Sequence, residues 1–543
     1  MPSLLQKQPE QPGPAPEPAG ESAEEARPLH APPTADDYEA ASRRRLVWLG
    51  VGGTLLASAA ALLFAGTGTD NILLPLVLLV GVVTPILLWR FPRLSLYAIL
   101  AAVCLFEMGI LGGDDGMPYK DALTDRIPFF WNVNTIFQVY GHANFKGVPL
   151  NLMEIFVLTA GVCSTLRAVY TGTTRLRAGA LFVPIIIYMA FVCTAEVNGV
   201  LGGGDFKISL QEMRSQVYLL LAYLMAVNMV RTRRDVLTLL WIFVVCVGLK
   251  GIMYTFRRYV TLHGLPLPDQ GVGSHEEAFL FDLFALLLIV LVLCRVLPKM
   301  QWMMLTLLPL VITGNLACNR RAATAAMILA VPVLLAAAFQ ALPERRRMAG
   351  IIALVLVGGF SIYYPAFKNS DSLFAQPARA IRSNFQPDAR DASSNASRDA
   401  ENANLMATVH SAPVQGIGYG RPYLHVVPMA DISKIYPLED YLPHNQVLWV
   451  WERVGTLGFL AFWMMISAIF IFAGQTIRSP EADGFVKALG LFALLATLLL
   501  VIFGMLDLQL SNFRDILFVG IWVGVLAALP TLDTDPAPAR RAL

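Results

Sequence analysis

The chain has 543 residues, of which 56% are hydrophobic and 15% are charged, with a mean hydropathy of +0.58 and a net charge of +2. A soluble protein carries about 25% charged residues, so this composition excludes a water-soluble globular protein and predicts one embedded in lipid. Nothing in the charge distribution indicates nucleic acid as a partner.

Residues 1–42 contain nine prolines and no apolar run. Such a segment cannot bury enough surface to offset its ordering entropy, so we expect a disordered tail. It is not a signal peptide, because the first apolar segment begins only after Arg43, Arg44 and Arg45. These arginines predict that the tail lies in the cytoplasm.

Apolar runs of about 17–25 residues follow, each long enough to cross a hydrocarbon core of ~30 Å. They predict an all-α, polytopic transmembrane bundle of about 12–14 spans. The expected spans are 46–64, 72–89, 94–111, 149–166, 178–197, 209–230, 236–256, 277–297, 301–318, 322–342, 349–365, 446–473, 485–506 and 516–530. The bundle thus extends over 43–365 and 446–534, with a large loop at 366–445 and a tail at 535–543.

Basic residues follow every second expected span, as in Arg345–Arg347, whereas the short loops at 65–71, 198–208 and 507–515 contain few. By the positive-inside rule both termini are cytoplasmic, and the large loop is external. The six cysteines all lie in apolar runs, so we expect small buried residues and no disulfide or metal site.

Two external segments are long enough to be functional. Residues 112–148 contain Asp114 and Asp115, but no third ligand at a useful spacing, so we expect a solvated turn and no metal. Residues 366–445 are polar and rich in Arg, Asp, Asn, Ser and Pro, and we expect an ordered loop there.

Several short motifs lie around this loop. They are Cys318–Ala323 (CNRRAA), Ser397–Glu401 (SRDAE), Ala412–Gly420 (APVQGIGYG), Pro443–Trp449 (PHNQVLW) and Trp451–Phe459 (WERVGTLGF). In this order they resemble the motifs of the O-antigen ligase and O-antigen polymerase superfamily: an Arg-x-Ala motif, a loop arginine, a Gly-rich turn, His-Asn-x-x-Leu and Glu-x-x-Gly-x-x-Gly. The resemblance covers roughly residues 209–530. Two departures are the number of spans, which is usually nearer twelve, and Asn319, where serine is common.

The resemblance implies a GT-C-type glycosyltransferase of the bacterial inner membrane, with its active site on the periplasmic face. Members move a glycan from undecaprenyl diphosphate to lipid A core, to another repeat unit of a surface polysaccharide, or to protein. They use no nucleotide sugar, cofactor or metal. The implied partners are therefore the undecaprenyl-diphosphate-linked glycan, one of these acceptors and membrane lipids.

The chemistry of the residues agrees with this function. A diphosphate is best held by the permanently charged, bidentate guanidinium group, and Arg214, Arg320 and Arg321 lie near external helix ends. The alternative is that they extend to the interface as structural anchors. His444, the only one of seven histidines in such a motif, is the candidate general base that takes the proton of the acceptor hydroxyl.

Other motif residues have two interpretations each. Asn445 either orients His444 or caps the following helix, and we favour the cap. Gly416, Gly418 and Gly420 either turn backbone N–H groups toward phosphate or form a tight turn without a ligand. Tyr419 either stacks on a sugar or anchors at the interface.

Four charged positions complete the set. Arg398 either contacts the donor glycan or is a solvated loop charge. For Glu452 we favour a structural ion pair over a catalytic role. Lys250 and Asp282 lie inside spans and could form pairs within the bundle, and we assign neither a function.

A transporter or flippase is the main rival function. Transporters place ionisable residues at the midplane, whereas here we expect the midplane to be nearly free of charge and see no internal repeat. A scaffold without chemistry would be favoured only if the arginine–histidine set were missing. Among the transferases we favour a surface polysaccharide polymerase or an O-antigen ligase over a protein O-oligosaccharyltransferase, although all three share these motifs.

Overall fold

The structure is a computed structural model that describes residues 83–105, 152–171, 177–262, 271–272, 275–433, 436 and 438–532, together with Val47. The chain divides into two compact units, 1–86 and 87–543. Only Val47 and residues 83–86 of the first unit are described, so the architecture below is that of the second. The expected tails and the segment 112–148 lie outside the described residues.

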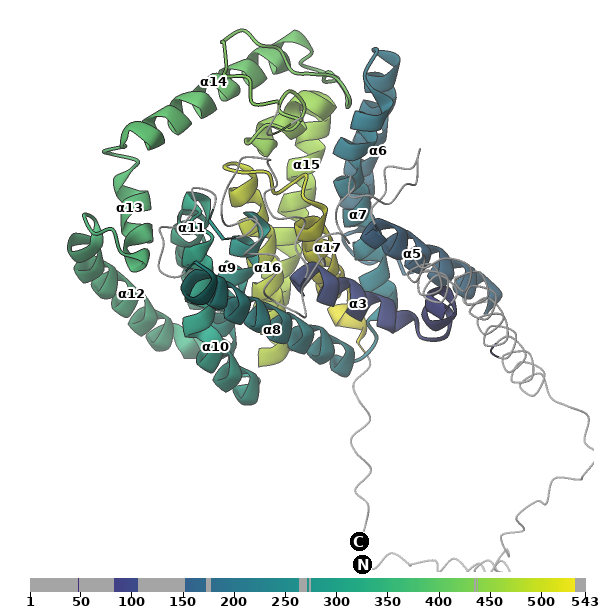
Figure 1. Ribbon diagram of the computed structural model, residues 1–543. Coiled ribbons are helices and arrows are strands. Elements are labelled where there is room, and N and C mark those ends of the chain that lie inside the picture. Colours follow the sequence, from purple (N-terminus) through teal and green to yellow (C-terminus); the bar gives the residue numbers. More distant parts are fainter. Residues whose placement is uncertain are drawn as a thin grey trace, which may run out of the picture. The chain divides into compact units, whose positions relative to one another are not determined.

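Throughout the described part the regular elements are helices (Figure 1). They are α3 (Pro92–Leu105), α5 (Leu152–Tyr170), α6 (Phe182–Leu201), α7 (Phe206–Met229), α8 (Arg233–Phe256), α9 (His275–Cys294), α10 (Pro298–Ala317), α11 (Arg321–Ala341), α12 (Arg346–Phe367), α13 (Gln376–Arg382), α14 (Ala389–Ser411), α15 (Gln446–Arg478), α16 (Gly484–Gly504) and α17 (Phe513–Ala528).

Ten of the described helices are long and apolar enough to cross a membrane, which confirms a multi-pass membrane protein. They correspond to ten of the last eleven expected spans, and the exception is the expected span 209–230. That segment forms α7, which contains Lys207, Glu212 and Arg214 and is too polar to qualify by composition. Counting a bent pair at 83–105 as one span gives eleven, and the expected span 46–64 lies outside the described residues.

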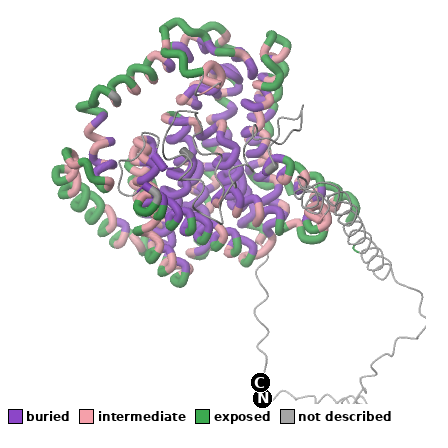
Figure 2. Tube along the Cα trace, in the orientation of Figure 1, coloured by how far each residue is buried: buried purple, intermediate pink, exposed green. Residues whose placement is uncertain are grey.

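The core is formed by α9, α16 and α17. In their most apolar windows 83%, 72% and 94% of residues are buried, whereas the corresponding share in α12 is 0%, so α12 lies at the edge (Figure 2). Small residues bring α17 against α7, since a Cβ added at Gly524 would stand 2.6 Å from the Cβ of Ala226. This is the close small-residue packing that is common between membrane helices.

The helix ends gather at two ends of the bundle. We call one the α14 end, where α6, α8, α10, α12 and α16 finish and α7, α9, α11, α15 and α17 begin; the other is the opposite end. The parallel course of α8 and α10 supports this assignment, because Gly248 faces Leu307 and Gly251 faces Val311. All the motif residues lie at the α14 end.

Residues 368–445 link α12 to α15 at the α14 end. The first half is more helical than the expected loop, with α13 and the 23-residue α14, which begins at the capping residue Asp388. From Ala412 to Asn445 the described backbone is irregular and packs on the start of α15. The six cysteines carry no disulfide, as expected, but Cys193 is exposed rather than buried.

Candidate functional site

One face of α14 carries a row of polar side chains. Asp391, Asn395, Arg398 and Glu401 follow one another at spacings of three and four residues, so they share one side of the helix. Residues between them, such as Ser397, are exposed, whereas Glu401 is only 4% exposed. This row faces the bundle and connects Arg321, a predicted diphosphate ligand, to His444, the predicted base.

Arg321 reaches one end of the row from the first turn of α11. Its Nη1 lies 3.3 Å from Oδ1 of Asp391 and 3.4 Å from Oδ1 of Asn395, and its Nη2 donates to the Ser394 hydroxyl at 3.3 Å. The Arg321 side chain keeps 30% of its surface exposed. It is therefore held in place but remains accessible.

His444 meets the other end of the row. Its Nδ1 lies 3.2 Å from Oε1 of Glu401, and its backbone N–H donates to Oε2 of the same carboxylate at 3.0 Å. Glu401 thus fixes both the backbone and the ring. The hydrogen bond that the His444 ring makes to the Glu401 carboxylate raises the pKa of His444 above its ordinary value, against an opposing effect of burial.

Arg398 lies between these two groups on α14. Asn395 and Glu401 are six residues apart, which is about 9 Å along a helix at 1.5 Å per residue, and Arg398 is midway. Its positive charge acts on His444 and lowers the pKa of that residue in part. The structure therefore brings together Arg321, Arg398 and His444, which lie far apart in the sequence.

Asn445 caps α15. Its side-chain oxygen accepts from the Leu448 N–H at 3.2 Å, and its Nδ2 donates to the Asn402 side chain of α14 at 3.0 Å. The preferred interpretation of Asn445 as a helix cap is confirmed. The cap also ties α14 to α15 directly beside His444.

The Gly-rich turn is part of the scaffold beneath the site. Gly416, Gly418 and Gly420 have φ of 71°, 80° and 78°, which L-residues rarely adopt. All three are buried, and a Cβ on Gly418 would stand 2.3 Å from the backbone nitrogen of Gly199 in α6. The turn therefore packs against α6 and α15.

Backbone hydrogen bonds in this turn are directed at protein groups. The N–H groups of Ile417 and Gly418 donate to the Glu452 and Arg453 carbonyls, at 2.8 and 3.2 Å. Those carbonyls are available because α15 is broken at Gly455, where φ is 69°. The N–H of Gly420 donates to the Glu212 carboxylate of α7. We therefore correct the suggested phosphate contact of Gly418 and Gly420: their N–H groups are used to hold the turn.

Tyr419 is also part of this scaffold. It is fully buried and its ring packs beside Trp449, with centroids 5.9 Å apart. A side chain with no exposed surface cannot stack on a sugar, so the suggested substrate contact of Tyr419 is corrected as well.

Arg453 is the centre of a buried polar cluster that the sequence analysis did not identify. Its side chain is fully buried, with Nε 2.9 Å from the Glu212 carboxylate of α7. It also donates to the carbonyls of Gly418 at 3.1 Å and Tyr441 at 2.8 Å. Glu452, also fully buried, lies 3.6 Å from Arg453, which agrees with the structural pairing preferred for it. The loop is thereby fixed to α7 and α15.

A second buried cluster lies near the same end, between α8, α9 and α17. Lys250 pairs with Glu277 at 2.8 Å, and Arg514 lies 2.9 Å from Glu277 and 3.9 Å from Glu276. Lys250 therefore pairs within the bundle, as suggested, and its partner is Glu277. The cluster lies near the α14 end, so it does not test the expectation that the midplane is nearly free of charge. The sequence signal that could have identified this cluster was the presence of charged residues within apolar runs.

The remaining two predicted arginines contact other parts of the bundle. Arg214 pairs with Glu154 of α5 at 3.2 Å and lies over the ring of Phe513 of α17, with 19% of its side chain exposed. Its contacts therefore connect α7 to α5 and α17. Arg320 lines an apolar cavity of about 440 Å³ between α9, α10, α11 and α12, which also contains Asp282 and Asn315.

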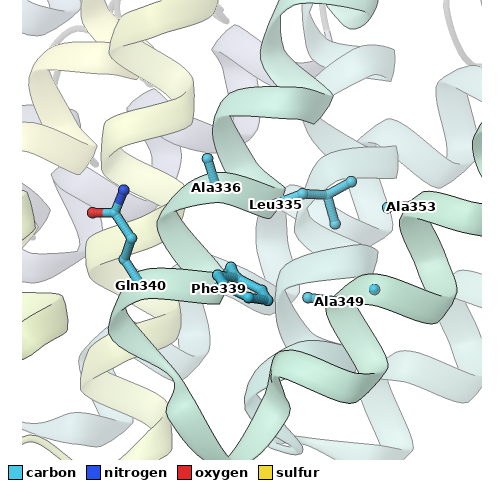
Figure 3. Close-up of a pocket in the computed structure, with 7 residues that line it drawn as sticks. Leu335, Ala336, Phe339, Gln340, Ala349 and Ala353 are labelled. Atoms are coloured by element: carbon cyan, nitrogen blue, oxygen red, sulfur yellow. The ribbon is translucent and has the colours of Figure 1, made fainter.

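A further cavity, of about 300 Å³, lies between α11 and α12 at the opposite end (Figure 3). Its lining is apolar apart from Gln340, whose side-chain oxygen accepts from Arg478. It contains no group suited to catalysis. Among the described residues no three His, Cys, Asp or Glu side chains are placed to hold a metal ion.

Comparison with known proteins finds no matching protein-family model and no matching curated relative. The α14 row and the residues that converge on it are therefore the features from which a function can be inferred.

Proposed function

We propose that the protein is a membrane glycosyltransferase that moves a glycan from a polyprenyl diphosphate to an acceptor hydroxyl. The observation that carries this proposal is the α14 row, which places a carboxylate-oriented histidine about two to three helical turns from an accessible arginine. A base and a cationic group at this separation suit a reaction in which a proton is removed at one side and a diphosphate leaves at the other.

His444 acts as the base. With Nδ1 directed at Glu401, Nε2 is the ring nitrogen that accepts the acceptor's proton. The acceptor oxygen then forms its bond to the anomeric carbon as the bond from that carbon to the phosphate oxygen breaks. The electron pair leaves with the diphosphate, and attack opposite the leaving group inverts the anomeric carbon.

Arg321 and Arg398 stabilise the charge that develops on the diphosphate. Arg320, the residue before Arg321, faces the apolar cavity of about 440 Å³, whose lining suits a hydrocarbon chain. The two neighbouring arginines thus lie at a boundary between an apolar cavity and a polar helix face. A lipid diphosphate requires such a boundary.

A flippase for the same lipid-linked glycan is the second candidate. The observation that favours it is the buried cluster of Lys250, Glu277 and Arg514, because ionisable residues inside a membrane bundle are frequent in transport pathways. Here each of the three has an oppositely charged partner, as expected of a structural cluster.

The test is transfer by the purified full-length protein in detergent, supplied with undecaprenyl-diphosphate oligosaccharides extracted from the source cells. We expect release of the lipid diphosphate and transfer of glycan, and a loss of at least ~100-fold in His444→Ala, which is what a general base contributes. His425→Ala is the matched control, since His425 lies in the same loop and also pairs with a carboxylate, Asp440, at 2.9 Å.

Three outcomes separate the candidates. Full activity in His444→Ala would remove the base, and equal losses in both histidine variants would indicate a general effect on the loop. Wild-type protein that binds the lipid without turnover would favour the flippase. If turnover is observed, the product identifies the acceptor as a polysaccharide, lipid A core or a protein.

A further inference from the structure

A basic cavity lies at the opposite end of the bundle, remote from α14. It has a volume of about 580 Å³ and lies between the start of α3, the second half of α5 and the second half of α7. Its wall includes four arginines: Arg90, Arg93, Arg167 and Arg231. The positive-inside rule accounts for basic residues at this end of the bundle, but not for four of them lining one cavity.

The contacts of these arginines show which of them are fixed by the fold. Arg93 pairs with Asp235 at 3.1 Å, and Arg167 donates to the carbonyls of Trp89 and Arg90. Arg90 is exposed, with its guanidinium 5.2 Å from the Phe91 ring centroid. Four arginines thus line the cavity, and the carboxylate of Asp235 pairs with one of them, Arg93.

The other wall of the cavity is apolar. Leu221, Leu224, Met225 and Met229 of α7 line it. The hydroxyl groups that reach the cavity from α5, such as that of Thr165, donate to carbonyls of their own helix, so the arginines are its main donors. The cavity therefore offers cationic donors on one side and a hydrocarbon surface on the other.

We propose that this cavity binds an anionic glycerophospholipid, with its phosphate among the arginines and an acyl chain along α7. A basic pocket between membrane helices is suited to such headgroups, which each nearby arginine attracts by about 1 kcal/mol. A free phosphate ion would make no use of the apolar wall, which is why we assign the site to a lipid. The inference does not depend on the proposed transferase activity.

Binding can be measured on the full-length protein in detergent by native mass spectrometry. The probes are phosphatidylglycerol, phosphatidylcholine with the same acyl chains, and inorganic phosphate. We expect phosphatidylglycerol to bind more tightly than phosphatidylcholine, and Arg90→Gln to weaken it by about 5-fold, which corresponds to one lost cationic contact. Arg347→Gln, an exposed arginine at the start of α12 at the same end, is the matched control and should leave binding unchanged.

A second variant keeps the proposal testable if Arg90→Gln fails to fold. Thr165→Trp leaves every arginine in place and fills the cavity from an exposed position on α5, so it should reduce binding of phosphatidylglycerol by at least about 10-fold. The proposal is overturned if both lipids bind equally, if Arg90→Gln and Arg347→Gln behave alike, or if inorganic phosphate displaces phosphatidylglycerol at equal concentration.

Discussion

Replacing Glu401 with glutamine tests whether this buried carboxylate sets the basicity of His444. Glutamine keeps the size of the side chain and can still accept the hydrogen bond from the His444 backbone N–H, but it carries no charge. The carboxylate raises the pKa of His444, so Glu401→Gln should lower it. The neutral ring is the active base, and the rate therefore falls when the pH drops below this pKa. In the variant that fall should occur at lower pH.

The structure gives the approximate strength of the interaction between the Glu401 carboxylate and the His444 ring. Two unit charges 3.2 Å apart interact by ~5 kcal/mol at an effective dielectric constant of ~20. The His444 side chain is 37% exposed, however, so solvent screens most of this energy. We expect about 1.5 kcal/mol to remain, at the lower end of the range for a hydrogen bond to a charged group, which is enough to move the acidic limb measurably to lower pH.

The assay is the pH dependence of kcat/KM for glycan transfer by wild type and Glu401→Gln. Asp440→Asn is the matched control, because it removes the carboxylate from the other histidine–acid pair of the same loop. Its acidic limb should coincide with that of wild type. An acidic limb in Glu401→Gln that does not move, or moves to higher pH, would refute the assigned role of the carboxylate.

Three further predictions concern the scaffold and the donor site. Arg453→Met should destabilise the protein by about 3–5 kcal/mol in thermal unfolding, because the Glu212 carboxylate is left buried without its cation, and adding Glu212→Gln should restore part of the loss. Gly418→Ala should be more destabilising than Gly203→Ala: both have positive φ, but an added Cβ at Gly203 meets open space. Arg321→Gln should raise the KM for the lipid-linked donor by about 10-fold and leave the melting temperature unchanged, since one exposed ion pair contributes at most ~1 kcal/mol to stability.

The membrane-spanning helices were predictable because lipid imposes a strong constraint on sequence. Every backbone polar group must be satisfied within the helix, and about 20 apolar residues are needed to span the hydrocarbon core. The exception, α7, shows the limit of this criterion: Glu212 and Arg214 make the helix polar, but both are paired with charges on neighbouring helices. The composition of one segment does not show that its charges are neutralised by another.

The partners of the buried charges could not be predicted from the sequence, for a related reason. Lys250 has three acidic candidates on α9, which are Glu276, Glu277 and Asp282. Glu277 and Asp282 are five residues apart and so lie about 140° apart around the helix. Which of them faces α8 depends on the rotation of α9, and its first turn also contacts α17. A local pattern does not fix that rotation.

The helix α14 could have been predicted but was interpreted as part of a loop. Asp388 is a favourable N-cap, and the following residues are rich in alanine. Its polar composition gave it the appearance of a connection between spans. The spacing from Asp391 to Glu401 then had no structural meaning, and the relation between Arg321, Arg398 and His444 could only be supplied by family resemblance.

The contrast between the two kinds of arginine supports the division between scaffold and site. Arg453 is fully buried and lies 2.9 Å from its carboxylate, so exchanging this partner for a ligand would expose an unpaired buried charge. Arg321 keeps 30% of its side chain exposed, and its contacts with α14 are 3.3–3.4 Å long. These longer contacts cost little to replace, and a diphosphate would offer shorter, charge-assisted hydrogen bonds in return. An arginine positioned by weak contacts is suited to binding a ligand, whereas one held by strong buried contacts is suited to holding the fold.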